Sequence, residues 1–103
     1  MSVKVLQINF KFNIPSADLK NGLTPFVKDI AAVSGLRWKV WIMNEQENEA
    51  GGIYLFDDED SIQAYLGGPI IAGLKSNPAL SDISAKVFDV VEDFTAETRG
   101  PIK

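Results

Sequence analysis

The side chains of this sequence that could take part in chemistry are lysines, a tyrosine and an amide in segments where apolar and polar residues alternate. Lys39 and Lys86 can accept a proton, because burial lowers the pKa of a lysine. The hydroxyl of Tyr54 needs a partner if it is buried, so it can donate a hydrogen bond to a substrate. Asn9 lies among apolar residues, where an amide is unfavourable without a reason. We therefore take Asn9, Tyr54 and Lys86 as candidate catalytic residues.

The two tryptophans are three residues apart, which places them on opposite faces of an extended strand unless a bulge intervenes. We expect Trp41 to line the pocket as a fourth catalytic candidate. Trp38 is a candidate for substrate binding, together with Gln7, Lys39 and Phe88. Each has a structural alternative, since tryptophans pack in cores and subunit interfaces, tyrosine tips reach solvent and lysines pair with acids.

The chain of 103 residues contains no histidine and no cysteine. This composition excludes disulfides, thiolate catalysis and zinc–sulfur sites, and it closes most routes to hydrolysis, metalloenzyme chemistry and haem catalysis. A net charge of −4 argues against a nucleic-acid partner. No apolar stretch is long enough to span a bilayer and the first residues do not resemble a signal peptide, so we expect a cytoplasmic protein without membrane contact.

Hydrophobic periodicity predicts the elements that position these side chains. Strands are expected at residues 3–12, 36–43, 51–56 and 85–92, the last starting as early as residue 81, with a helix at residues 16–33. A second helix should follow the acidic run at residues 57–60 and be split at residues 67–69, the run serving as a helix cap rather than a metal site. The order β-α-β-β-α-β is that of a ferredoxin-like α+β fold, a four-stranded antiparallel sheet with both helices on one face. We expect one domain over residues 1–103, with residues 95–103 as a tail that is either an arm over a neighbouring subunit or mobile.

Two details of the first helix stay open in the sequence. Ser16 is a fair N-cap for this helix. Pro25 could kink a single helix. Alternatively, Thr24 could cap a second helix that has Pro25 at its first position.

Both faces of the expected sheet are rich in apolar residues, although two helices can cover only one face. A monomer would expose a large aromatic patch, so we expect a homodimer whose two sheets face each other and enclose a small-molecule site. We place the pocket between the exposed side of the sheet and a neighbouring helix or subunit, lined by Asn9, Trp41, Tyr54 and Phe88.

Residues 36–41, 49–56 and 85–90 closely resemble the corresponding segments of the YdhR-type mono-oxygenases, small members of the dimeric α/β-barrel superfamily. The opening segment at residues 6–13 and the proline in the first helix are also similar to that family. The resemblance extends to about Phe94. It implies a ferredoxin-like protomer, a homodimer, and a pocket between sheet and helices.

Better-understood barrel mono-oxygenases oxidise polycyclic phenols and anthrones without flavin or metal, using Asn, Trp, Tyr and Arg side chains. By residue type, the resemblance implies such roles for Asn9, Trp38, Trp41, Tyr54 and Arg37, and no cofactor. A bound phenol or enol would lose a proton and its anion would then reduce dioxygen. Haem-degrading relatives use a histidine, which this sequence lacks.

Three classes of function therefore remain. The first is a cofactor-independent mono-oxygenase acting on a small aromatic or polycyclic compound. The second is a non-catalytic or stress-related homodimer that binds a small apolar ligand. The third is a regulatory ferredoxin-like module, which the acidic charge and the lack of a DNA-binding segment disfavour.

Overall fold

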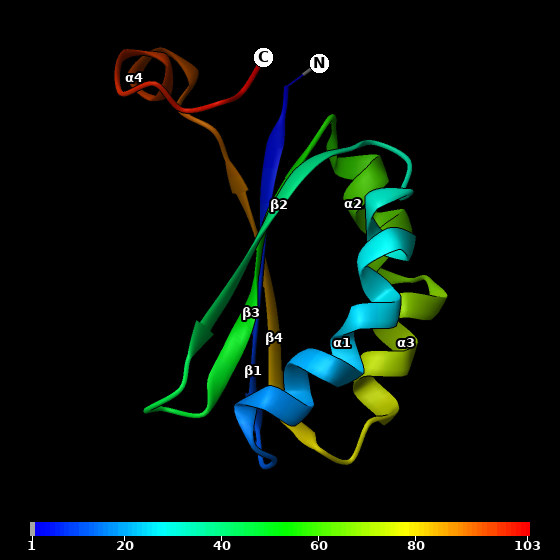
Figure 1. Cartoon of the computed structure of the whole chain (residues 1–103). Helices are drawn as coiled ribbons and strands as arrows, with labels where there is room; N and C mark the ends of the chain where they lie inside the picture. The colour runs from blue at the N-terminus through cyan, green and yellow to red at the C-terminus, as the bar shows by residue number, and fades with distance from the viewer. Residues whose placement is uncertain (1) are drawn as a thin grey trace.

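Period-two alternation at the start of the chain forms the strand β1 (Lys4–Phe12). Its apolar even positions, Leu6, Ile8, Phe10 and Phe12, are all buried against the helices. The structure is a computed structural model that describes residues 2–103, and it has a sheet with three helices on one face (Figure 1). The apolar face of the first strand is therefore the helix-covered face, as predicted.

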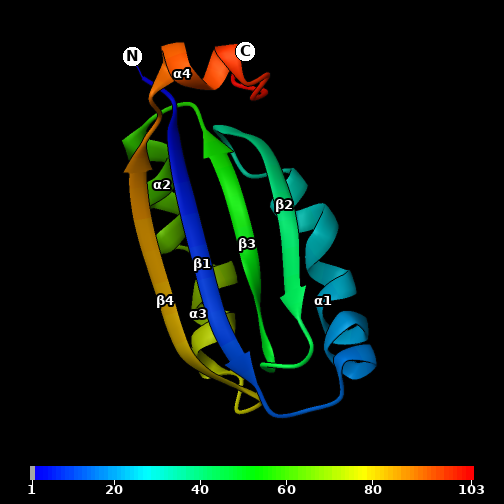
Figure 2. The same cartoon turned by 90° about the vertical axis from the view of Figure 1, so that its left-hand side faces the viewer.

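The other strands are β2 (Leu36–Asn44), β3 (Glu49–Phe56) and β4 (Leu80–Asp89). The sheet has the order β2-β3-β1-β4, and all neighbouring strands are antiparallel (Figure 2). This arrangement confirms the ferredoxin-like α+β fold. The last strand begins one residue before the early limit expected from the sequence.

The helices α1 (Ser16–Ala31), α2 (Glu59–Leu66) and α3 (Pro69–Ser76) cover one face of the sheet. The acidic run acts as a cap, because the Asp58 carboxylate accepts a hydrogen bond from the backbone N–H of Ser61 at 2.8 Å. This bond lowers the pKa of Asp58. The split at residues 67–69 is also confirmed, with Pro69 in the first turn of α3. No helix in residues 2–103 is long and apolar enough to cross a membrane.

One continuous helix contains Pro25, so the possibility of two helices is rejected. Ser16 is not the N-cap, which falls on Pro15 because the Pro15 carbonyl accepts the first helical hydrogen bond, from Leu19 at 3.0 Å. The Ser16 hydroxyl instead bonds to a carboxylate oxygen of Glu45 in the loop after β2, at 2.6 Å.

The end of the chain is not extended beyond Asp89, where β4 stops three residues before the expected limit of residue 92. It contains a short helix, α4 (Glu92–Glu97), which stands on the side of the sheet opposite the other helices (Figure 1). The last residues then return to the start of β2. The indole of Trp38 donates to the carbonyl of Pro101 at 2.7 Å, and the Arg37 guanidinium donates to that of Ile102 at 2.8 Å. The acids Glu92 and Asp93 in the first turn are the sequence signal for this helix.

The tightest packing lies where α2 meets the middle of the sheet. Leu6, Phe56 and Ile62 expose no surface. The rings of Tyr54, Phe56 and Tyr65 form a cluster with centroid separations between 5.3 and 6.0 Å. This cluster anchors α2 to β3.

Candidate functional site

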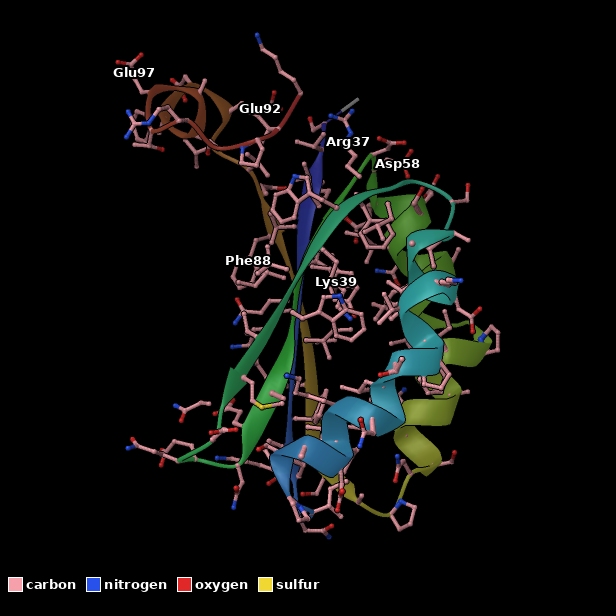
Figure 3. The ribbon with its side chains drawn as sticks, in the orientation of Figure 1. Arg37, Lys39, Asp58, Phe88, Glu92 and Glu97 are labelled. Carbon is pink, nitrogen blue, oxygen red and sulfur yellow. The ribbon has the colours of Figure 1, made fainter. Side chains whose placement is uncertain are left out.

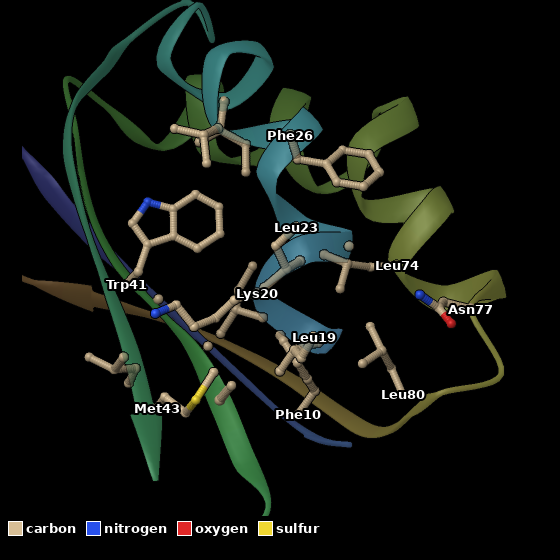
Figure 4. Close-up of a pocket in the computed structure, with 18 of the residues that line it drawn as sticks. Phe10, Leu19, Lys20, Leu23, Phe26, Trp41, Met43, Leu74, Asn77 and Leu80 are labelled. Atoms are coloured by element: carbon tan, nitrogen blue, oxygen red, sulfur yellow. The ribbon is translucent and has the colours of Figure 1, made fainter. Parts of the chain in front are cut away.

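A cavity of about 920 Å³ separates α1 from the sheet (Figure 4). Its floor is formed by β1, β2 and β3, and its walls by α1 and α3. The lining is predominantly apolar and aromatic, and it includes Leu23, Phe26, Lys39, Trp41, Met43, Tyr54 and Leu74.

Small residues on β3 leave the space that this cavity occupies. Trp41 pairs with Gly52 across the two strands, so no side chain from β3 fills the helix-covered face beside the indole. On the other side, Phe26 of α1 lines the cavity without closing it, with 37% of its surface exposed. Trp41 is similarly exposed at 38%. Aromatic surface is therefore available to a ligand rather than used in core packing.

The side chain of Lys39 lies over Gly52 inside this cavity. A Cβ atom built at Gly52 would stand 2.4 Å from the Lys39 Cε atom, so the lysine in this conformation occupies space that a larger residue at position 52 would need. The ammonium nitrogen Nζ is 3.3 Å from the centroid of the Trp41 ring and 4.5 Å from that of Tyr54. Such contacts with aromatic faces favour a cation.

Burial nevertheless lowers the pKa of Lys39 from 10.5 to about 7. Lys39 takes part in none of the ion pairs found among residues 2–103, so no carboxylate offsets this loss of hydration. A lysine with a pKa near neutrality can both take up and release a proton at the pH of most cells.

Tyr54 joins the cavity to the packed core. Its ring lines the cavity, while its hydroxyl lies 2.9 Å from the hydroxyl of Tyr65 in the buried cluster. Burial raises the pKa of Tyr54, and the hydroxyl of Tyr65 adds to the effect. Burial also raises the pKa of Tyr65. Because the Tyr54 hydroxyl already has this partner, the residue presents mainly its ring to a ligand.

The predicted quartet of Asn9, Trp41, Tyr54 and Phe88 does not share one cavity. Trp41 and Tyr54 face the helices, whereas Asn9 and Phe88 lie on the open face of the sheet. Figure 3 shows Lys39 pointing toward the helices and Phe88 pointing away. The reason is the pleat, since residues paired across antiparallel strands point to the same side and Phe88 pairs with Val5, on the face opposite the buried positions of β1.

The other candidates also lie on the open face. Lys86 pairs with Gln7 there and is exposed, and the Gln7 amide donates to the Asn9 side-chain oxygen at 3.0 Å. Trp38 lies on the face opposite Trp41, as the spacing of three predicted, and bonds to the end of the chain.

Arg37 is outside the cavity as well. Its guanidinium pairs with the Asp57 carboxylate at 2.6 Å and holds the chain terminus. Lys39, Trp41 and Tyr54 are thus the predicted site residues that the fold brings together.

Several lining residues were missed by the sequence reasoning, chiefly Leu23 and Phe26 on α1, Met43 on β2 and Leu74 on α3. The adjacent pair Phe26 and Val27 was the available signal. It widens the apolar stripe of α1 beyond what one closely packed helix face requires.

The residues of the cavity do not suit haem or a bound metal ion. The chain has no imidazole or thiolate ligand, and the Tyr54 hydroxyl is already bonded to Tyr65. Within residues 2–103, no cluster of three acidic side chains is placed to hold a metal ion.

Comparison with known proteins gives a family match over most of the chain. Residues 5–101 match the family model described as "Putative mono-oxygenase ydhR". A search of curated proteins finds no match.

Several solved structures are similar to this chain. A protein of unknown function from Nitrosomonas europaea is 23% identical, with a TM-score of 0.74 and coverage of 88% of this chain and 91% of that one. SnoaB, a cofactor-independent oxygenase from Streptomyces nogalater, is 15% identical, with a TM-score of 0.70 and coverage of 87% and 94%. MhuD, a haem degrader from Mycobacterium tuberculosis, is 19% identical, with a TM-score of 0.65 and coverage of 84% and 95%. At these identities the similarity establishes a shared fold.

Proposed function

Because the chain belongs to the family described as the ydhR mono-oxygenases, we propose that it is a cofactor-independent mono-oxygenase that oxidises a small aromatic or polycyclic compound in the cavity beneath α1. The observation that carries the proposal is the placement of Lys39, a half-buried amine between two aromatic rings in an apolar cavity. The fold shared with SnoaB, itself a cofactor-independent oxygenase, is consistent with it.

The lining of the cavity suits a flat aromatic substrate. A volume of about 920 Å³ accommodates several fused rings, within the usual range for small-molecule sites. Trp41 on the floor and Phe26 on the α1 wall supply exposed aromatic surface. Lys39 lies beside the Trp41 ring, where it can reach an acidic group on a ligand stacked there.

The reaction that these groups support begins with a proton transfer. Neutral Lys39 removes a proton from an anthrone-like CH₂ group or its phenol tautomer, and its ammonium form stabilises the resulting anion. The anion supplies electrons to dioxygen. One oxygen atom enters the substrate as a carbonyl and the other leaves as water, so CH₂ and O₂ become C=O and H₂O. The substrate is its own reductant, and no external electron donor is needed.

A homodimer formed through the open face of the sheet is part of the proposal. Val40 and Phe88 on that face are 51% and 47% exposed, and Trp38, Ile42 and Ile53 lie on the same side. This is more apolar surface than a sheet facing water usually carries. Asn9 and Lys86 would then lie at the subunit interface and not in the cavity.

A second candidate is a homodimer that binds the same ligands without chemistry. The bond between Tyr54 and Tyr65 favours it, because this bond occupies the one hydroxyl from β3 that could serve a reaction. The two candidates predict the same ligand class and differ only in turnover.

Oxygen uptake with anthrone and related quinols tests the oxygenase. We expect turnover by the wild-type protein and a loss of about 10²- to 10⁴-fold in Lys39→Met, the usual effect of removing a general base. Lys28→Met, on the exposed side of α1, is the matched control and should retain activity. Binding without oxygen uptake would establish the non-catalytic candidate, and a loss confined to Lys86→Met would return the catalytic role to the open face.

Sedimentation of the wild-type protein and of Phe88→Asp tests the dimer. We expect a wild-type dimer at micromolar concentration and a shift toward monomer in the variant, because a charge would be buried at the interface. A wild-type monomer at this concentration would reject the proposed assembly.

A further inference from the structure

Lys39 differs from the other lysines in its surroundings. Lys4 pairs with Asp89, and Lys11 pairs with Glu49. The Lys39 side chain instead contacts the ring face of Trp41 and occupies the space above Gly52. Its amine lies in a cavity large enough for a ligand and is not engaged by a carboxylate among residues 2–103. An organic molecule that enters the cavity can therefore reach this amine.

We propose that Lys39 condenses reversibly with an aromatic aldehyde or ketone bound in the cavity and forms an imine. In this step the Nζ lone pair attacks the carbonyl carbon and a C–N bond forms. The carbonyl oxygen gains two protons, both originating from the amine, and leaves as water. The product is a C=N bond, with no change of oxidation state and no requirement for another reactant.

The surroundings of Lys39 favour the neutral amine, which is the nucleophile in this reaction. Desolvation gives Lys39 a pKa of about 7, so about half of the amine is neutral at neutral pH, compared with about one part in three thousand for an ordinary lysine. Desolvated lysines in apolar pockets are the ones that form such imines.

The same surroundings define the class of carbonyl compound. Trp41 and Phe26 offer ring faces, and the lining is mainly apolar, which favours a flat aromatic carbonyl over a sugar or a keto acid. This activity goes beyond the proposed oxygenation, because it needs neither dioxygen nor loss of a substrate proton.

Reductive trapping of the imine tests the proposal. The wild-type protein is incubated at pH 7 with 2-naphthaldehyde and sodium cyanoborohydride, and the modified lysine is located by peptide mass spectrometry. We expect Lys39 to be modified at least about tenfold faster than the exposed Lys28, because about half of the Lys39 amine is neutral at pH 7 and the cavity holds the aldehyde beside it. The rate at Lys39 should rise with pH and reach a plateau above about pH 7.

Two comparisons make the outcome decisive. Lys39→Arg keeps the positive charge but cannot form the imine, and it should lose the dominant adduct. Acetaldehyde, which has no ring, should label Lys39 less selectively than 2-naphthaldehyde. An adduct spread over the exposed lysines, or equal selectivity for the two aldehydes, would overturn the proposal. Labelling of Lys39 in a protein that consumes no oxygen would support the imine and reject the oxygenase, and oxygen uptake without labelling would do the reverse.

Discussion

The helix-covered face of the sheet is packed in one half and open in the other. Under α2, Phe56 and Ile62 expose no surface and the aromatic rings touch. Under α1, Phe26 and Trp41 keep more than a third of their surface exposed, at 37% and 38%. Both halves contain large apolar side chains, so hydrophobicity alone does not distinguish a core from a binding site. What distinguishes them is whether the facing helix fills the space.

Tyr54 lies at the boundary between these halves. Its hydroxyl belongs to the packed half and its ring to the cavity. A change at this residue should therefore be felt on both sides, whereas changes elsewhere should affect one half only.

The largest expected effect is a difference between the two halves in how much a truncated aromatic side chain lowers the free energy of unfolding. Phe56→Ala should lower the free energy of unfolding by about 3–5 kcal/mol, because it leaves a cavity in a filled core. Trp41→Ala should cost about 1 kcal/mol or less, because the indole is already exposed to an open space. Urea denaturation of both variants measures the difference, and equal losses would mean that the α1 half is core as well.

The two halves should also differ in how they make stability depend on pH, because Lys39 lies in the cavity half. Its pKa is about 7 in the folded protein and 10.5 in a solvated chain, so between these values the unfolded state binds the extra proton. The free energy of unfolding should therefore rise with pH across this window, by at most about 1.4 kcal/mol per pH unit. Below pH 7 the lysine is charged in both states, so the protein bears the full cost of burying that charge. Urea titrations of wild type and Lys39→Met at pH 7, 8.5 and 9.5 measure the contribution by difference. Parallel pH profiles would show that the lysine is solvated.

The two tryptophans of β2 sharpen the comparison between faces of one strand. Trp41→Phe should weaken binding of a planar ligand such as 2-naphthol about fivefold, or ~1 kcal/mol, through lost contact area. Trp38→Phe, the matched control, should leave affinity unchanged. It should instead accelerate amide exchange near Pro101, because the indole hydrogen bond at 2.7 Å is lost. Weaker binding in both variants would place the ligand elsewhere.

An effect of about the same size is expected at the boundary residue. Tyr54→Phe should lower the free energy of unfolding by about 0.5–1.5 kcal/mol, because the Tyr65 hydroxyl loses its partner. Tyr65→Phe should cost a similar amount. The double variant should cost less than the sum, since no hydroxyl is then left unpaired. Additive losses in thermal or urea unfolding would show that the two hydroxyls do not interact.

Much of the fold could be predicted from the sequence because its signals are local. Alternation along β1 identified the buried face, and the residues from Gly67 to Pro69 identified the break between helices. The helix α4 was missed, although Glu92 and Asp93 are typical of a helix start.

The candidate site was predicted only in part, because strand register is not a local property. Alternation divides each strand into two sets of residues but does not say which sets of neighbouring strands share a face. The pairing of Lys39 with Tyr54, after an irregularity in the register between Leu36 and Trp38, settles this for β2. The same limitation explains why Lys86 and Asn9 were grouped with Trp41.

The proline within α1 has a consequence for the time a ligand spends inside the protein. Pro25 has no N–H to donate, so the helix lacks one hydrogen bond beside the cavity. An added Cβ at Gly22 would meet nothing within 4 Å, so no other part of the chain packs against α1 at that point. We expect this stretch to open locally far more often than the sheet unfolds, on the microsecond-to-millisecond scale typical of such motions. The rates of ligand entry and escape would then be set by the local opening of one helix turn. Substitutions in that turn could change these rates without altering any residue that touches the ligand's reactive atoms.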